Sequence, residues 1–221
     1  MTPEKVHVIH NWADPSFIRP LARCENPFVR EQGLSGKLVV LYAGNMGRFH
    51  DLETLLEAAV RLEAREEVVF LFIGGGAKKK RLISYASQKH LKNIQFLPYQ
   101  PADDLPRTIT AGDVGVVSLE RGTEGLCVPS KLYTYMAGGL AILALTGPES
   151  EVADIVERHE CGARASQGDV DRVVSLLELW LEDPELLEEH KSRSRQCLVD
   201  EFARGHAVRR YADLLSRATE R

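Results

Sequence analysis

The residues best suited to bind an anion lie in the turn AGNMGRFHD at 43–51. Gly44 and Gly47 allow a ligand to approach the backbone closely, and Arg48 and His50 add a positive and a titratable group. The glycine spacing matches neither the dinucleotide pattern G-x-G-x-x-G nor the P-loop pattern G-x-x-x-x-G-K. The turn therefore predicts an anion site of another class and disfavours an NAD-binding or P-loop protein.

A second turn, in EGLCVPSKLYTYMAGG at 124–139, leads into a short helix with polar groups at its start. Helical spacing predicts one buried apolar face, made of Leu132, Tyr135, Met136 and Gly139. Lys131 and Thr134 fall on another face, near the helix end where unpaired N–H groups favour an anion. Two interpretations stay open: Lys131 and Thr134 bind a polar anionic ligand, or Ser130 only caps the helix and Lys131 points to water.

A third glycine turn, GGGAKKKRL at 74–82, is less specific. A glycine run before a basic helix can receive a phosphate. A solvated lysine face explains the same pattern equally well.

The turns belong to a regular alternation of strands and helices. Apolar or β-branched runs predict strands at 6–9, 37–44, 67–76, 93–98, 113–119 and 140–145. Most runs are continuous, which is typical of strands covered on both faces. Amphipathic patterns predict helices between them, at 51–63, 77–91, 102–111, 130–138 and 149–158. The alternation predicts an α/β fold with a Rossmann-like, doubly wound parallel sheet, in which ligands bind at the carboxyl ends of the strands.

The pattern divides the chain into three parts. Residues 1–36 read as a strand and linker that lead in from a missing N-terminal domain. Residues 37–166 form the sheet core. Residues 167–221 contain three amphipathic helices, the middle one starting at Pro184, and we expect them to pack back on the core or on a partner domain.

Composition narrows the class of protein. The net charge of −4 gives no electrostatic footprint for nucleic acid, and we expect none as a partner. No apolar run approaches the roughly 20 residues that span a bilayer, and the four cysteines form neither a C-x-x-C pair nor a metal-ligand spacing with the seven histidines. We expect a cytoplasmic protein without a metal ion. Peripheral attachment to the inner face of the membrane stays open.

Five segments together resemble the C-terminal half of retaining glycosyltransferases of family 4. They are VHVIHNWADPSFIRP, LVVLYAGNMGRFHDLETLLEAA, VVFLFIGGGAKKKRL, NIQFLPYQPADDLPRTITAGDVGVVSL and VPSKLYTYMAGGLAILAL. The resemblance covers residues 6–215 and is strongest to the branch that builds bacterial surface polysaccharides, with its P-S-K-L donor motif. It implies one half of a GT-B fold, in which two Rossmann-like domains face one cleft.

The resemblance implies an activity as well. The chain would be the donor domain of an EC 2.4 enzyme that transfers a hexosyl group, with retention, from a nucleoside-diphosphate sugar to a polysaccharide or glycolipid. Its partner would be an N-terminal acceptor domain or a separate acceptor subunit, and we expect the chain to be inactive alone. No cofactor or metal ion is implied.

The resemblance also implies residue roles. Arg48, Lys131 and the helix start at 129–131 would stabilise the leaving diphosphate, and the loop at 96–100 would cradle the base. The implied donor-binding residues are Gly44, Asn45, Gly47, His50, Gly75, Pro98, Tyr99, Gly125, Leu126, Cys127, Val128, Ser130 and Thr134.

This sequence departs from the family pattern at four positions. The usual Arg and Lys positions fall on Asn45 and His50, and the two usual glutamates fall on Leu126 and Thr134. Glu124 would need a two-residue slip to replace the first of them, and a threonine hydroxyl donates only one hydrogen bond to a ribose. Two alternatives therefore stay open: a nucleotide-sugar-binding module without catalysis, and another GT-B enzyme such as a nucleotide-sugar 2-epimerase.

Overall fold

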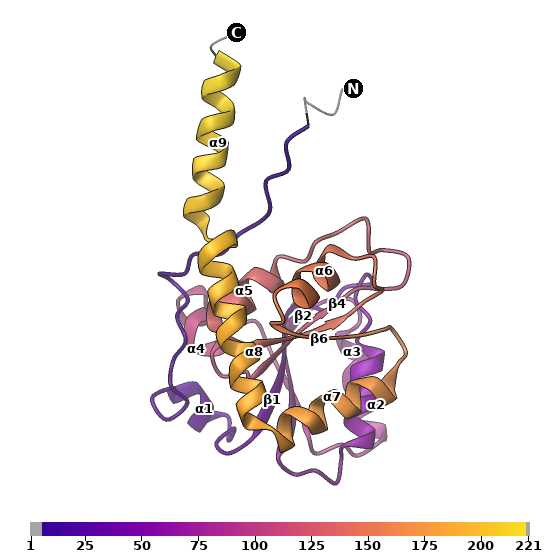
Figure 1. The fold of residues 1–221 in the computed structure, drawn as a ribbon. Helices are drawn as coiled ribbons and strands as arrows, with labels where there is room; N and C mark the ends of the chain where they lie inside the picture. The colour runs from indigo at the N-terminus through magenta and orange to yellow at the C-terminus, as the bar shows by residue number, and fades with distance from the viewer. Residues whose placement is uncertain (1–5, 220–221) are drawn as a thin grey trace.

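Parallel strands with helices on both faces make up the computed structural model, which describes residues 6–219 (Figure 1). The six strands are β1 (Leu38–Asn45), β2 (Val68–Gly75), β3 (Ile94–Leu97), β4 (Val114–Ser118), β5 (Ala141–Leu145) and β6 (Gly162–Ala165). Their order across the sheet is β3-β2-β1-β4-β5-β6, and every pairing is parallel. The predicted Rossmann-like, doubly wound sheet is confirmed.

The helices fill the connections between strands and continue after β6. They are α1 (Pro27–Glu31), α2 (Glu53–Arg61), α3 (Lys79–Gln88), α4 (Leu105–Ile109), α5 (Lys131–Gly138), α6 (Glu151–Arg158), α7 (Val170–Glu182), α8 (Pro184–Cys197) and α9 (Arg204–Thr219). A 3-10 turn at Ala102–Asp104 precedes α4, and a π-helical turn at Leu198–Phe202 joins α8 to α9. Each helix predicted between strands is present, and Pro184 starts α8 as expected.

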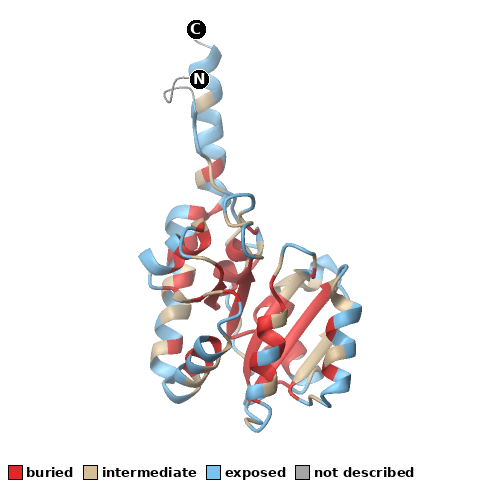
Figure 2. Cartoon of the chain, turned by 90° about the vertical axis from the view of Figure 1, so that its right-hand side faces the viewer, coloured by how far each residue is buried: buried red, intermediate tan, exposed pale blue. Residues whose placement is uncertain are grey.

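The sheet is covered on both faces, which explains the continuous apolar runs of its strands. Along β1, Val39 and Leu41 enter one core with α5 and α6, whereas Val40 and Tyr42 enter the other with α2 and α7. β4 and β5 are buried throughout, and β1 is buried along its first five residues (Figure 2). Burial of this apolar surface on both sides is the main stabilising contribution to the fold.

Three short elements differ from the expectations. Residues 6–9 form no strand, while residues 1–5 of the same predicted segment lie outside the described residues. The helix α1 was not predicted, although Asn26 accepts a hydrogen bond from Phe28 N and so caps it. The strand β6 was also missed, because four residues of sequence GARA carry no apolar pattern.

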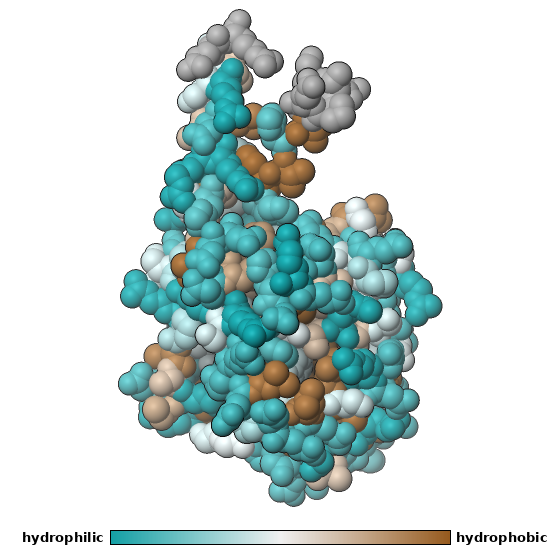
Figure 3. Space-filling model, viewed as in Figure 1, coloured by the Kyte–Doolittle hydropathy of each residue, from teal (hydrophilic) through white to brown (hydrophobic). Residues whose placement is uncertain are grey.

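The C-terminal helices divide into two groups. α7 lies against α2, and α8 lies against β5 and α5, but α9 extends away from the sheet with only Ala207 buried. Hydrophobic side chains lie on the N-terminal segment beside α9 (Figure 3). Within residues 6–219, none of the helices combines the length and apolar character needed to cross a membrane.

The N-terminal segment and α9 leave the sheet domain at one shared point. Ala13 and Ala203 form an isolated parallel bridge there. The Ala13 N–H donates to Phe202 O at 3.3 Å, and the Arg204 N–H donates to Ala13 O at 2.9 Å. The two segments therefore start side by side.

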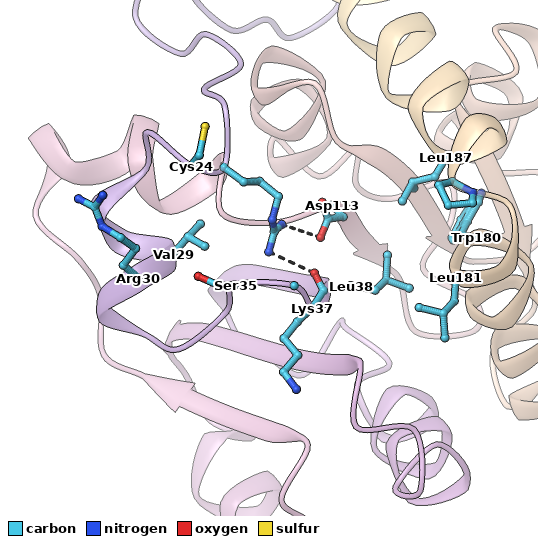
Figure 4. A pocket seen from close by; sticks show the side chains of 13 residues that line it. Cys24, Val29, Arg30, Ser35, Lys37, Leu38, Asp113, Trp180, Leu181 and Leu187 are labelled. Atoms are coloured by element: carbon cyan, nitrogen blue, oxygen red, sulfur yellow. Dashed lines mark hydrogen bonds and ion pairs between the residues drawn. The ribbon is translucent and has the colours of Figure 1, made fainter.

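The linker is anchored to the amino ends of the strands by an ion pair between the half-buried Arg23 and the buried Asp113. Asp113 accepts hydrogen bonds from Arg23 at 2.7 Å and from Val39 N at 2.8 Å, and Arg23 also donates to the Leu34 carbonyl. A cavity of about 630 Å³ lies beside this pair, with Trp180 on its other side (Figure 4). It opens at the strand edge opposite to the one where ligands of such sheets bind.

Candidate functional site

A cavity of about 520 Å³ lies at the carboxyl ends of β1 and β2 and at the start of α5. It is the place where an open parallel sheet of this strand order binds its ligands. The predicted site residues that line it are Gly44, Asn45, His50, Tyr99, Cys127, Val128, Ser130, Lys131 and Thr134. The fold thus gathers the turn after β1, the loop after β3 and the start of α5.

The other predicted residues lie outside the cavity lining. Gly75 lies under the Tyr99 ring, with 3.2 Å between the ring and the place of a Cβ. Arg48 is exposed and lines no part of the cavity in the described structure, and Leu126 is 80% exposed. The remaining predicted residues outside the lining are Gly47, Pro98 and Gly125.

Two glycines let the strand ends approach each other beneath the site. Gly44 of β1 pairs with Gly74 of β2, and their φ angles are +134° and +130°. A Cβ on Gly74 would lie 2.1 Å from the Gly44 carbonyl oxygen and 3.2 Å from the Tyr99 ring. Because no L side chain fits this geometry without strain, glycine is required at position 74.

Lys131 places a cation in the cavity without a neutralising anion. Its Nζ donates to the Tyr42 hydroxyl at 3.2 Å and lies 4.7 Å from the centre of the Tyr42 ring. Within residues 6–219 no carboxylate lies within ion-pair distance of it. Burial lowers the pKa of Lys131 to about 8. A bound anion would offset this desolvation and restore the charged form.

His50 contributes a ring whose orientation is fixed. Nδ1 lies 2.8 Å from the Ser118 carbonyl oxygen, which only accepts, so Nδ1 carries a proton. In the neutral ring the acceptor nitrogen is then Nε2. Burial is the main cause that lowers the pKa of His50, and the charge on Lys131 adds to it.

The start of α5 is held against β1 by Tyr135. Its hydroxyl accepts from the Ala43 N–H at 2.7 Å and donates to the Ala43 carbonyl at 3.3 Å. Ser130 occupies the N-cap position, but its side chain makes no capping hydrogen bond. The interpretation of Ser130 as a simple cap is therefore wrong. Ser130 and Lys131, at the start of α5, line the cavity instead.

The family pattern has glutamates at the positions of Leu126 and Thr134, and Glu124 replaces neither of them. The Thr134 hydroxyl lies 3.5 Å from the Ser130 carbonyl, at the outer limit of a hydrogen bond. Glu124 accepts from Gln167 Nε2 at 2.9 Å and packs beside Gly147, away from the cavity. The two-residue slip that would bring Glu124 into the site does not occur.

Lys78 and Lys79, at the start of the basic helix after β2, are hydrogen-bonded inside the protein, whereas Lys80 is exposed. Lys78 Nζ donates to Glu53 at 2.8 Å, to Glu120 at 2.7 Å and to the His50 carbonyl. Lys79 Nζ donates to backbone carbonyls of β2 and β3. These two lysines hold the turns around the site in place.

The sequence interpretation missed two polar features of the lining, Thr108 and the hydrogen-bonding hydroxyl of Tyr135, and it included Gln100 only as part of the loop at 96–100. Tyr135 was predicted only as part of the apolar face of its helix. The sequence signal for Thr108 is a hydroxyl at a helical position that is otherwise flanked by Leu105 and Ile109. Among residues 6–219 no group of three or more His, Cys, Asp or Glu side chains is placed to hold a metal ion.

This chain is similar to both curated proteins and solved structures. It is 30% identical over 176 residues to "Probable glycosyltransferase WbjE" of Pseudomonas aeruginosa, a match that covers 80% of this chain and 44% of that protein. It is 36% identical over 143 residues to "Putative colanic acid biosynthesis glycosyl transferase WcaI" of Escherichia coli strain K12, covering 63% of this chain and 35% of that protein. The chain thus spans less than half the length of these relatives.

The crystal structure of Anabaena Alr3699/HepE in complex with UDP-glucose has the same fold. Its TM-score is 0.84 at 16% identity, over 98% of this chain and 58% of that one. The family model described as glycosyl transferases group 1 matches residues 26–196, which include the whole sheet and the cavity. The chain belongs to the glycosyl transferases group 1 family.

Proposed function

We propose that the chain is the donor-binding domain of a retaining, family 4 glycosyltransferase. It would bind a nucleoside-diphosphate sugar and take part in transferring the hexosyl group to a polysaccharide or glycolipid acceptor. The observation that carries the proposal is Lys131, an unneutralised cation in the cavity at the start of α5. The UDP-glucose bound by the similarly folded HepE and the colanic acid biosynthesis named for WcaI support it.

The geometry suits the departure of a nucleoside diphosphate. As the bond from the sugar C1 to the diphosphate oxygen breaks, negative charge grows on the leaving oxygens. The Lys131 ammonium and the N–H groups at the start of α5 are fixed in place to stabilise it. Arg48 is proposed to add charge from outside the lining, and the mechanism uses no metal ion because these groups supply the positive charge.

One observation favours the alternative of a binding module without catalysis. Glu124 is held by Gln167 outside the cavity, so Thr134 has no carboxylate beside it to grip a ribose. Such a module would bind nucleotide sugars and leave transfer to another protein. Both functions require the chain to bind a nucleotide sugar, but only the glycosyltransferase takes part in sugar transfer.

Calorimetric titration with UDP, GDP and ADP tests the binding common to both. We expect at least one nucleotide to bind, with a dissociation constant between about 1 μM and 1 mM, which corresponds to about 4 to 8 kcal/mol. The base preference would identify the donor nucleotide. If the chain bound none of the three at millimolar concentration, the proposed function would be wrong.

An acceptor-side domain or subunit is also part of the proposal. A cavity of about 300 Å³ lies between the 6–9 segment and the α9 face that carries Arg210 and Arg217. The opposite face exposes a stripe at helical spacing, Val208, Tyr211 and Leu215, which are 55%, 46% and 65% exposed. We propose that the acceptor side packs on this stripe, because the similar proteins are more than twice as long as the matched region.

This arrangement predicts binding without transfer by the chain alone. With radiolabelled UDP-glucose, we expect the isolated chain to bind the donor but to pass no glucose to a glycolipid acceptor, because the proposed acceptor side lies outside residues 1–221. Scintillation counting of the extracted lipid measures transfer. Transfer above that of a Lys131→Met control would show that the chain needs no acceptor-side partner.

A further inference from the structure

Thr108 carries a buried hydroxyl that has no hydrogen-bond partner among residues 6–219. The residue is 1% exposed, lies in α4 and lines the cavity. Thr110, two residues later, makes the expected helical bond from its hydroxyl to the Pro106 carbonyl at 2.8 Å. Thr108 makes no such bond to Asp104, so its hydroxyl is left without a partner inside the protein.

An unpaired buried hydroxyl lowers the stability of the folded chain, since it loses its hydrogen bonds to water and gains none. Buried polar groups in folded proteins nearly always have a partner. A hydroxyl in a cavity lining acquires one when a polar ligand group enters. The cavity position and the missing partner are two separate observations that point to a ligand contact at Thr108.

The lining divides into a cationic and an apolar part. Lys131 and His50 come from α5 and the turn after β1. Thr108, Leu105 and Ile109 come from α4, and Tyr99 comes from the loop after β3. One side of the Tyr99 ring packs on bare glycine backbone, and 61% of the residue is exposed. An aromatic ring, apolar side chains and one hydroxyl suit a nucleobase, whereas the Lys131 ammonium suits a diphosphate.

Resting on the proposed function, we propose that the Thr108 hydroxyl hydrogen-bonds to the edge of the nucleobase and contributes to base specificity. A hydroxyl both donates and accepts, so it can pair with a carbonyl or an N–H group of the base. Thr108 is therefore a specificity-determining residue of the donor site. It takes no part in the bond-breaking step.

The test compares Thr108→Val with Thr146→Val. Valine keeps the shape of threonine and removes the hydroxyl. Thr146 is the matched control, because its hydroxyl is also buried without a partner in the described residues but lies outside the cavity lining. The probes are UMP, GMP and AMP, together with ribose 5-phosphate, which lacks only the base. Ligand-observed NMR gives the dissociation constants, and thermal melts report the free protein.

We expect Thr108→Val to bind the preferred monophosphate about threefold to tenfold more weakly than the wild type, because the variant loses one hydrogen bond to the base. Ribose 5-phosphate should bind both proteins equally. Thr146→Val should leave every dissociation constant unchanged, and both variants should melt at a higher temperature than the wild type. Thr108→Ser, which restores the hydroxyl, should recover most of the affinity.

Two outcomes would overturn the assignment of Thr108 to the base. Equal weakening for the monophosphate and for ribose 5-phosphate would place the contact on the ribose phosphate. Unchanged binding of the monophosphate to Thr108→Val would remove the contact altogether. If the wild type bound no nucleotide, the proposed function itself would fail, and this inference would fall with it.

Discussion

Lys131→Met is expected to weaken UDP binding by about tenfold to a hundredfold. Methionine keeps the length of the side chain but removes the ammonium, and a hydrogen bond to a charged group contributes about 1.5–3 kcal/mol. Within residues 6–219 no other lysine lines the cavity to replace it. Calorimetric titration against the wild type measures the loss. Lys80→Met, at an exposed lysine of α3, is the matched control and should bind like the wild type.

The pH dependence of binding gives a second readout of the same variant. With a pKa of about 8, the ammonium of the free protein loses its proton as the pH rises through 8. Wild-type affinity should therefore fall between pH 7 and pH 9.5, and the affinity of Lys131→Met should stay flat. Parallel curves for the two proteins would show that Lys131 does not contact the anion.

Removing this charge should also stabilise the free protein. The fold lowers the pKa of Lys131 from 10.5 to about 8, so the folded chain binds fewer protons than the unfolded chain between these values. The charged form is therefore unfavourable in the fold below pH 8, and this cost disappears above pH 10.5. Lys131→Met should raise the melting temperature at pH 7 by a few degrees and have little effect near pH 11.

Gly74→Ala is expected to lower the free energy of unfolding by about 3 kcal/mol or more. A Cβ would lie 2.1 Å from the Gly44 carbonyl oxygen, and this backbone atom can move only by disturbing the pairing of β1 with β2. Overpacking costs about 1–3 kcal/mol and a positive φ about 1–2 kcal/mol per residue. Urea denaturation measures the loss through the shift of the midpoint.

Gly33→Ala separates the two causes. Gly33 also has a positive φ, +67°, but a Cβ there would meet nothing within 4 Å. Its loss should be limited to the backbone strain, about 1–2 kcal/mol. Equal losses at positions 33 and 74 would contradict the predicted clash beneath the site.

The fold could be predicted from the sequence wherever its signal is local. Continuous apolar runs predicted β1 and β2, and the amphipathic pattern at 51–63 predicted α2, because burial on both faces of a sheet fixes these patterns. The strand β6 escaped detection, since its four residues are mostly half-buried. Pairing to β5 holds it in the sheet, and no local pattern shows such pairing.

The parts of the site that have a local sequence signal could also be predicted. The turn after β1 and the start of α5 carry their own glycine and helix signals, and both do line the cavity. Glu53 and Glu120, the partners of Lys78, lie 25 and 42 residues away along the chain, so no local pattern could show that this lysine is paired inside the protein. The unpartnered state of Thr108 depends on every neighbour in space, and only the structure reveals it.

The bridge between Ala13 and Ala203 has a mechanical consequence. A body joined through one extended segment can swivel about that segment, whereas two segments pinned side by side resist torsion. At this bridge the 6–12 segment and α9 leave the sheet domain together. A domain packed on both segments would therefore undergo hinge bending about a single axis and would keep the same side toward the sheet domain.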